Sequence, residues 1–156
     1  MVSLGYRLSP AWRNQMREVN LRDVSANALH YDLFLGDVTF QSKGADFSAC
    51  WGWVPVLDFA SAMLRIVVAL EHSGRQQLEF TESEAVLNFE RSEDQVRISA
   101  SYTSATAIVP YQDLRVAVAT FAQKAVTELG AEFPELRTAA AFQSFERELL
   151  GSPGSC

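Results

Sequence analysis

Hydrophobic and polar positions alternate along two stretches in the first third of the chain, which predicts two β-strands. In residues 29–40 the apolar phase slips by one position at Gly36-Asp37, so we expect a bulge or a two-residue turn there. In the second stretch four residues share one predicted strand face: Phe47, Ala49, Trp51 and Trp53. The pattern therefore places two half-buried strands before residue 55.

Four segments have the apolar spacing of helices. The first begins at Ser9-Pro10, and its apolar positions are Trp12, Met16 and Val19. Residues 55–72 are apolar almost all round, with a narrow polar stripe, so we expect this helix at the centre of the fold. Residues 110–130 form a third helix, and a fourth follows from Pro134 with inward positions at Leu136, Phe142, Phe145 and Leu149.

Between the central helix and the C-terminal helices, strand patterns follow one another closely, at residues 78–81, 84–90, 96–102 and 106–109. Runs of neighbouring strands favour antiparallel pairing. The sequence thus predicts one α+β domain over residues 1–150, with an antiparallel sheet of about five strands packed against the central helix and two C-terminal helices. Residues 151–156 are predicted to be a flexible C-terminal tail.

The composition and net charge of the chain indicate which kinds of partner it can bind. The chain has 156 residues, 48% of them hydrophobic, and a net charge of −6. Such a surface repels nucleic acid and anionic membranes and attracts a basic protein. Cys50 is predicted to be buried and inert beside Trp51, and Cys156 is the last residue. With no signal peptide or membrane-spanning segment visible, we expect reduced thiols and a cytoplasmic location.

Motifs that carry enzyme chemistry are missing from the sequence. It has no Walker-type loop, no G-x-G-x-x-G and no G-x-S-x-G. A histidine-based zinc site would need more ligands than His30, His72 and Cys50 supply. We therefore expect no catalytic residues, no cofactor and no metal, and a protein that is not an enzyme.

Acidic residues gather in one segment, residues 79–94, where six acids against the single base Arg91 give a net charge of −5. The simpler interpretation is a solvated outer sheet face, and the functional one is an acidic docking surface for a basic partner. The candidate partner-binding residues are Glu79, Glu82, Glu84, Glu90, Glu93 and Asp94.

A second group of residues favours an alternative function, a small-ligand-binding protein or a carboxylate-dependent enzyme with a pocket between the sheet and the central helix. Its candidate lining is Trp51, Trp53, Asp58, Arg65 and Tyr102. For Asp58 and Arg65 we favour a structural pair or a solvent-facing seam over a polar cleft. One of the two tryptophans is a candidate interface anchor.

Three segments, residues 51–59, 78–83 and 96–102, resemble small bacterial α+β proteins. Together with the size, acidity and strand–helix–meander order, residues 29–150 resemble the immunity proteins of bacterial polymorphic and contact-dependent toxin systems. The resemblance implies a cytoplasmic protein that neutralises a cognate toxin by occluding its active site. The partner would carry a basic cleft, such as that of a nuclease. A homodimer formed through a sheet edge or a C-terminal helix stays open as a third hypothesis.

Overall fold

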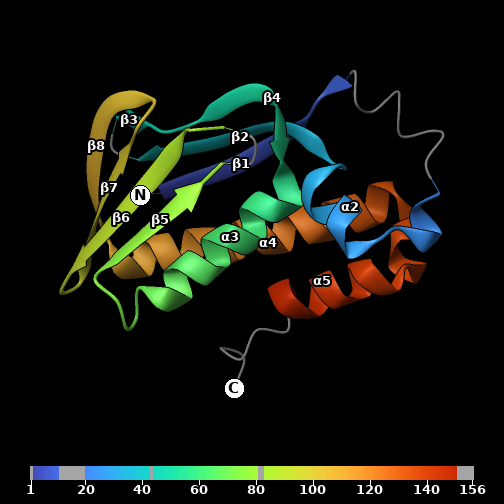
Figure 1. The fold of residues 1–156 in the computed structure, drawn as a ribbon. Helices are drawn as coiled ribbons and strands as arrows, with labels where there is room; N and C mark the ends of the chain where they lie inside the picture. The colour runs from blue at the N-terminus through green and yellow to red at the C-terminus, as the bar shows by residue number, and fades with distance from the viewer. Residues whose placement is uncertain (1, 11–19, 43, 81–82, 151–156) are drawn as a thin grey trace.

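In the computed structural model, two antiparallel sheets lie over a layer of helices (Figure 1). The structure describes residues 2–10, 20–42, 44–80 and 83–150. The predicted α+β class is confirmed. The strands are distributed over two sheets because the central helix separates the first group from the second along the chain.

The first sheet, sheet A, is built around β2. It contains β1 (Val2–Leu8), β2 (Leu35–Ser42), β3 (Ala45–Asp46) and β4 (Ala49–Pro55). β1 pairs with β2 along its whole length, whereas β3 and β4 share the other side of β2. At the β1–β2 contact, a β-carbon added to Gly36 would lie 2.1 Å from the carbonyl oxygen of Arg7. The two backbones therefore approach closely enough to require glycine at this position.

The pairing is irregular at Gly36-Asp37, as predicted, but the extra residues are in β4, and β2 itself runs through this point without a bulge. In the β2–β4 pairing, Gly36 faces Val54, and Val38 faces Ala49. Between these two pairs the chain advances by two residues in β2 but by five in β4, so the additional residues are in β4. The bulge carries both tryptophans of the predicted pocket out of the regular ladder.

The second sheet, sheet B, is a four-stranded meander. Its strands are β5 (Arg75–Glu79), β6 (Val86–Ser92), β7 (Gln95–Ala100) and β8 (Thr103–Pro110). On β6 and β7 the predicted apolar residues are buried, at Leu87, Phe89, Val96 and Ile98. β6 and β7 pair antiparallel, as the run of neighbouring strand patterns predicted.

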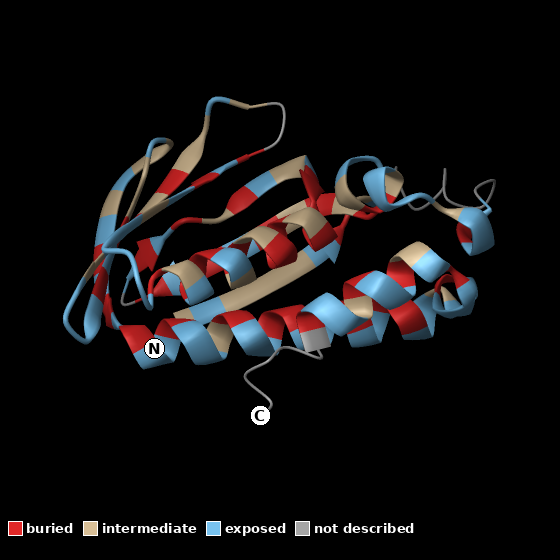
Figure 2. Ribbon diagram, turned by 60° about the horizontal axis from the view of Figure 1, so that its bottom comes forward, coloured by how far each residue is buried: buried red, intermediate tan, exposed pale blue. Residues whose placement is uncertain are grey.

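Helices cover the inner side of both sheets. α3 (Val56–Ala69) and α4 (Tyr111–Glu132) pack against the sheets, and the 3-10 helix η3 (Pro134–Thr138) and α5 (Ala140–Leu150) pack against these helices. The predicted central helix is α3, and it ends at Ala69 rather than at His72. Figure 2 shows buried residues on the inner sides of the helices and exposed residues on their outer sides. Phe59 of α3 packs against Phe80 and Phe121, which ties sheet B to α4 in one core.

The N-terminal third differs most from the prediction. The strand predicted from residue 29 is wrong over its first part, because residues 26–31 form the helix α2 (Ala26–Tyr31), preceded by the 3-10 helix η2 (Leu21–Asp23). The Ser25 hydroxyl accepts a hydrogen bond from the Ala28 N–H at 3.0 Å and caps α2. β1 was not predicted. The helix predicted to begin at Ser9-Pro10 lies mostly outside the described residues, as does the tail at 151–156.

Candidate functional site

Two stacked tryptophans lie in the bulge of β4. The ring centroids of Trp51 and Trp53 are 5.2 Å apart, and their planes are inclined by 23°. Trp53 is 38% exposed, whereas Trp51 is half-buried. The stacking agrees with the strand face that the sequence predicted for both residues. It leaves the outer ring, Trp53, available for contact with another molecule.

Gly52 and Asp37 fix the conformation of this bulge. Gly52 has a φ of 81°, a left-handed conformation that residues with a β-carbon rarely adopt. Its N–H donates a 2.8 Å hydrogen bond to Oδ1 of Asp37, whose other oxygen lies 3.3 Å from the Arg7 guanidinium. The backbone of the segment that carries the tryptophans is therefore fixed by a hydrogen bond to the Asp37 side chain of β2.

Cys50 is exposed, so the prediction of a buried thiol is wrong. Its neighbour Ala49 is fully buried and still paired with β2. Pairing resumes only at Val54, and the residues between the two paired positions leave the ladder. Because successive side chains of a strand point to opposite faces, Cys50 points away from the buried side of Ala49 and toward solvent.

Aromatic rings from three places in the chain surround Trp51. Its ring meets Phe80 and Tyr102 edge-on, at centroid distances of 5.2 Å in both cases. Phe80 and Tyr102 also contact each other, at 5.8 Å. Trp51, Trp53, Phe80 and Tyr102 are named the aromatic cluster below. The cluster joins the bulge of β4 to the end of β5 and to the turn between β7 and β8.

Tyr102 connects the two sheets. Its hydroxyl donates a 2.5 Å hydrogen bond to the carbonyl oxygen of Phe47, between β3 and β4. Burial raises the pKa of Tyr102 strongly, and the negative charge of Asp46 adds to that effect. The phenol therefore stays protonated and serves as a donor to the backbone.

Carboxylates lie beside the aromatic cluster. Asp46 is close enough to Tyr102 to affect its pKa, and hydrogen bonds from Ser48 lower the pKa of Asp46 itself. Glu84 lies in the turn that closes when the Phe80 N–H donates to the Ala85 carbonyl at 3.1 Å. Both carboxylates belong to exposed residues. This end of the molecule thus combines an exposed indole with negative charge.

The five described acids of residues 79–94 do not form one surface. Glu79 is exposed at the end of β5, close in the chain to Glu84, whereas Glu82 lies outside the described residues. Glu93 and Asp94 are in the turn at the opposite end of β6, together with Glu90 near that end of the strand. At about 3.3 Å per residue, Glu79, which faces Val86, lies roughly 13 Å along β6 from Glu90 and more than about 20 Å from the turn with Glu93 and Asp94.

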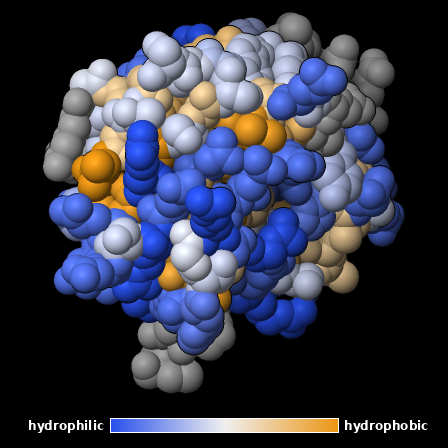
Figure 3. Space-filling model, turned by 60° about the vertical axis from the view of Figure 1, so that its left-hand side comes forward, coloured by the Kyte–Doolittle hydropathy of each residue, from blue (hydrophilic) through white to orange (hydrophobic). Residues whose placement is uncertain are grey.

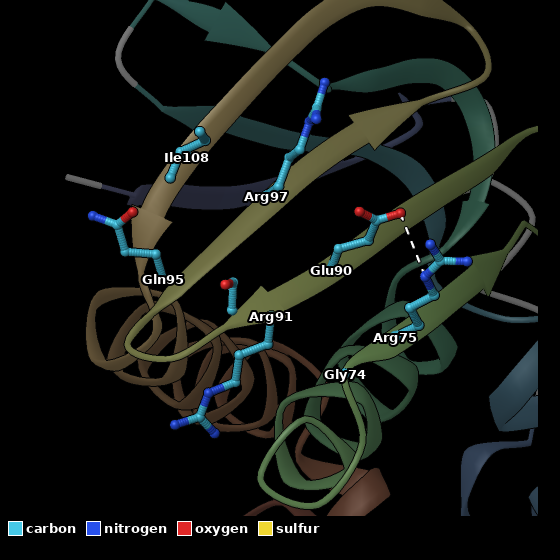
Figure 4. Close-up of a pocket in the computed structure, with 8 residues that line it drawn as sticks. Gly74, Arg75, Glu90, Arg91, Gln95, Arg97 and Ile108 are labelled. Atoms are coloured by element: carbon cyan, nitrogen blue, oxygen red, sulfur yellow. Dashed lines mark ion pairs between the residues drawn. The ribbon is translucent and has the colours of Figure 1, made fainter.

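Glu90 is flanked by arginines rather than by other acids. Across sheet B it faces Arg75 of β5 and Arg97 of β7, and its carboxylate lies 3.6 Å from the Arg75 guanidinium. Ile108 continues the same row on β8. These residues line a shallow hollow of about 460 Å³ on the outer side of the sheet (Figure 4), which is mostly hydrophilic on this side of the molecule (Figure 3). The outer face of sheet B is thus a mixed-charge surface.

Asp58 and Arg65 line a different groove. It measures about 500 Å³ and lies between α3 and β5, with Tyr31 at its edge. The Oδ1 atom of Asp58 lies 3.1 Å from Nδ1 of His30, within hydrogen-bond distance. Arg65 is exposed. The His30 ring also packs against Phe145, with centroids 4.7 Å apart. The five residues of the predicted pocket therefore separate into the aromatic cluster and this groove.

The sequence did not predict His30 as a partner of Asp58, because residue 30 was expected at the start of a strand and is instead in α2. Among the described residues, no group of three or more His, Cys, Asp or Glu is placed to hold a metal ion. No helix in the described part of the chain is long and apolar enough to span a membrane.

No family model, curated protein or solved structure matches this chain. We therefore infer its function from the residues on its surface.

Proposed function

We propose that this chain is a non-enzymatic binding protein of the immunity type, which neutralises a cognate protein toxin by covering a basic surface around the toxin's active site. The contact surface is the aromatic cluster with its neighbouring carboxylates. The observation that carries the proposal is the exposed Trp53, stacked on Trp51 in a cluster whose Tyr102 lies near Asp46 and whose Phe80 closes the turn that carries Glu84.

The chemistry of this surface suits lysine and arginine side chains. An exposed indole face attracts a cation that lies over it. Carboxylates form short, charge-assisted hydrogen bonds to ammonium and guanidinium groups. A net charge of −6 speeds the encounter with a basic partner at low salt. The basic cleft of a nuclease is a surface of this kind.

The surface is also pre-shaped. The hydrogen bond between Asp37 and Gly52 holds the bulge, and the contacts of Trp51 with Phe80 and Tyr102 hold the inner ring. A surface that is ordered before binding avoids the entropy cost of ordering loops and side chains in the complex. A surface of this kind favours tight binding.

The proposal predicts that a toxin gene lies next to the gene for this chain, and it is tested by co-expressing the chain with the toxin domain of that neighbour. We expect cells that carry the toxin to survive when the chain is present. Trp53→Ala is expected to abolish protection while the purified variant keeps the circular dichroism spectrum of the wild type. Cells that die despite the wild-type chain would show that it does not neutralise this toxin.

A pair of charge reversals separates the contact surface from general electrostatics. Glu84→Lys and Glu93→Lys change the net charge equally, but Glu84 is beside the aromatic cluster and Glu93 is at the other end of β6. We expect Glu84→Lys to weaken protection and toxin binding, and Glu93→Lys to leave both close to wild type. Equal losses in the two variants would contradict the assigned surface.

A further inference from the structure

We propose that two copies of this chain pair antiparallel through the edge of β5 that faces away from β6, which joins their two sheets B into one continuous sheet. This inference does not depend on toxin binding. It rests on the backbone of β5 and on the order of charges along that strand.

Hydrogen bonds at the two ends of β5 show which backbone groups face β6. The Phe80 N–H donates to the Ala85 carbonyl at 3.1 Å, and the Gly74 carbonyl accepts from the Arg91 N–H at 2.8 Å. Residues with even numbers therefore bond to β6. The N–H and C=O groups of the intervening residues point away from β6, toward the outer edge. Those residues are Arg75, Gln77 and Glu79.

Much of this outer edge is unpaired. The Ser73 hydroxyl donates to the Arg75 carbonyl at 3.0 Å and accepts weakly from the Arg75 N–H at 3.4 Å. Among the residues that the structure describes, none bonds to the backbone N–H of Gln77 or Glu79. β5 also has no proline and no bulge, two of the features by which edge strands avoid pairing with another chain.

The charges on β5 suit a second copy of itself. In an antiparallel pair centred on Gln77, Arg75 lies opposite the partner's Glu79, and the partner's Arg75 lies opposite Glu79. The Arg75 side chain is 84% exposed, and Glu79 forms no ion pair with any described residue. Both cross-strand pairs are therefore attractive, and each adds to the backbone ladder.

The row of charges on the outer face selects this register. Arg97, Glu90 and Arg75 alternate in sign across β7, β6 and β5, and the row stops at the edge of the sheet (Figure 4). The partner's Glu79 continues the alternation. Shifting the two strands by two residues would place Gln77, rather than Arg75, opposite a glutamate. The register centred on Gln77 thus gives the largest number of cross-strand pairs of opposite charge.

The groove between β5 and α3 leaves room for the second strand. It is open to solvent, measures about 500 Å³ and contains Tyr31 and Arg65 beside the edge of β5. A contact made mainly by one five-residue strand is smaller than a standard stable interface of about 1,600 Å². We therefore expect a dimer that dissociates on dilution.

Light scattering on the full chain tests the pairing. We expect the wild-type mass to rise with concentration from 17.3 kDa toward twice that value. Glu79→Arg and Arg75→Glu should each keep the protein monomeric, because like charges then face each other. The double variant should dimerise again, since it exchanges the two charges. A wild type that stays monomeric at all concentrations, or single variants that still dimerise, would overturn the proposal.

A cysteine on the two-fold axis tests the register. In a background of Cys50→Ser and Cys156→Ser, Gln77→Cys brings two thiols together at a Cα separation of about 5.5 Å, which a disulfide can bridge. Asn88→Cys is the matched control, because it faces the same side from the next strand. We expect mild oxidation to cross-link Gln77→Cys but not Asn88→Cys. No cross-link, or equal cross-linking of both variants, would contradict the register.

Discussion

Tyr102→Phe removes one hydroxyl group that joins the two sheets. The lost interaction is the 2.5 Å hydrogen bond to the carbonyl oxygen of Phe47, a residue that is 1% exposed. Because the phenylalanine ring keeps the aromatic contacts, the main change is a buried carbonyl without its donor. Leaving such a group unsatisfied costs about 1–3 kcal/mol. We expect the free energy of unfolding to fall by that amount near neutral pH.

The same bond makes the difference between wild type and variant depend on pH. Burial raises the pKa of Tyr102 above its ordinary value of 10.0, and the charge of Asp46 adds to the shift. The unfolded chain therefore ionises first. The stabilisation is fully present below pH 10.0 and is lost as the pH rises toward the folded-state pKa. Between pH 10.0 and the folded-state pKa, the advantage of the wild type should shrink by at most about 1.4 kcal/mol per pH unit.

Urea unfolding followed by tryptophan fluorescence measures both effects. Tyr31→Phe is the control, because it removes the same hydroxyl from a residue that is 45% exposed and should change the free energy of unfolding by less than about 0.5 kcal/mol. A Tyr102→Phe variant as stable as the control near neutral pH would refute the reasoning. A difference that grows rather than shrinks above pH 10.0 would refute the assigned direction of the pKa shift.

Three further changes test other parts of the fold. Gly52→Ala forces a β-carbon into a backbone with φ of 81°, so we expect a loss of about 1–2 kcal/mol in urea unfolding and altered Trp fluorescence. Met63→Ala opens a cavity in the fully buried side of α3 and should cost about 2–5 kcal/mol, whereas Val68→Ala, 59% exposed on the same helix, should cost less than about 0.5 kcal/mol. A double-mutant cycle of His30→Ala and Asp58→Ala should give a coupling of about 0.5–1 kcal/mol, and a value near zero would mean that their 3.1 Å contact does not stabilise the fold.

The sequence predicted the long elements well, because their patterns repeat over many residues. α3 is buried around most of its circumference, and α4 buries one side at the expected spacing, including Leu114, Phe121 and Leu129. The last helix is interrupted between η3 and α5, yet its four predicted inward residues are all buried. Burial thus followed the apolar period even where the helix itself was broken.

Short elements were predicted poorly because few residues define them. α2 is six residues long, and Leu29, Tyr31, Leu33 and Leu35 alternate as they would in a strand. The Ser25 cap and the tertiary contacts of His30 decide the conformation instead. β1 had a usable signal, since Val2, Leu4, Tyr6 and Leu8 alternate with polar residues or glycine.

The candidate site depended on distances that a sequence does not contain. Acids close in the chain are separated because β6 runs straight between the turns that carry them. Trp51 and Tyr102, distant in the chain, are in contact because a bulge and a turn meet between the sheets. The pairing of Asp58 with His30 rather than Arg65 depends on where α2 packs. The sequence could identify the residue types but not their neighbours.

Gly36 gives this architecture a marker that can be followed through evolution. A side chain there would collide with the main chain of β1, whereas a β-carbon at Gly74 would meet its nearest atom at an ordinary 3.8 Å. We therefore expect glycine to be conserved at position 36 and to vary at position 74 among homologues. A distant homologue aligned to this chain can be judged by that contrast before its own structure is known.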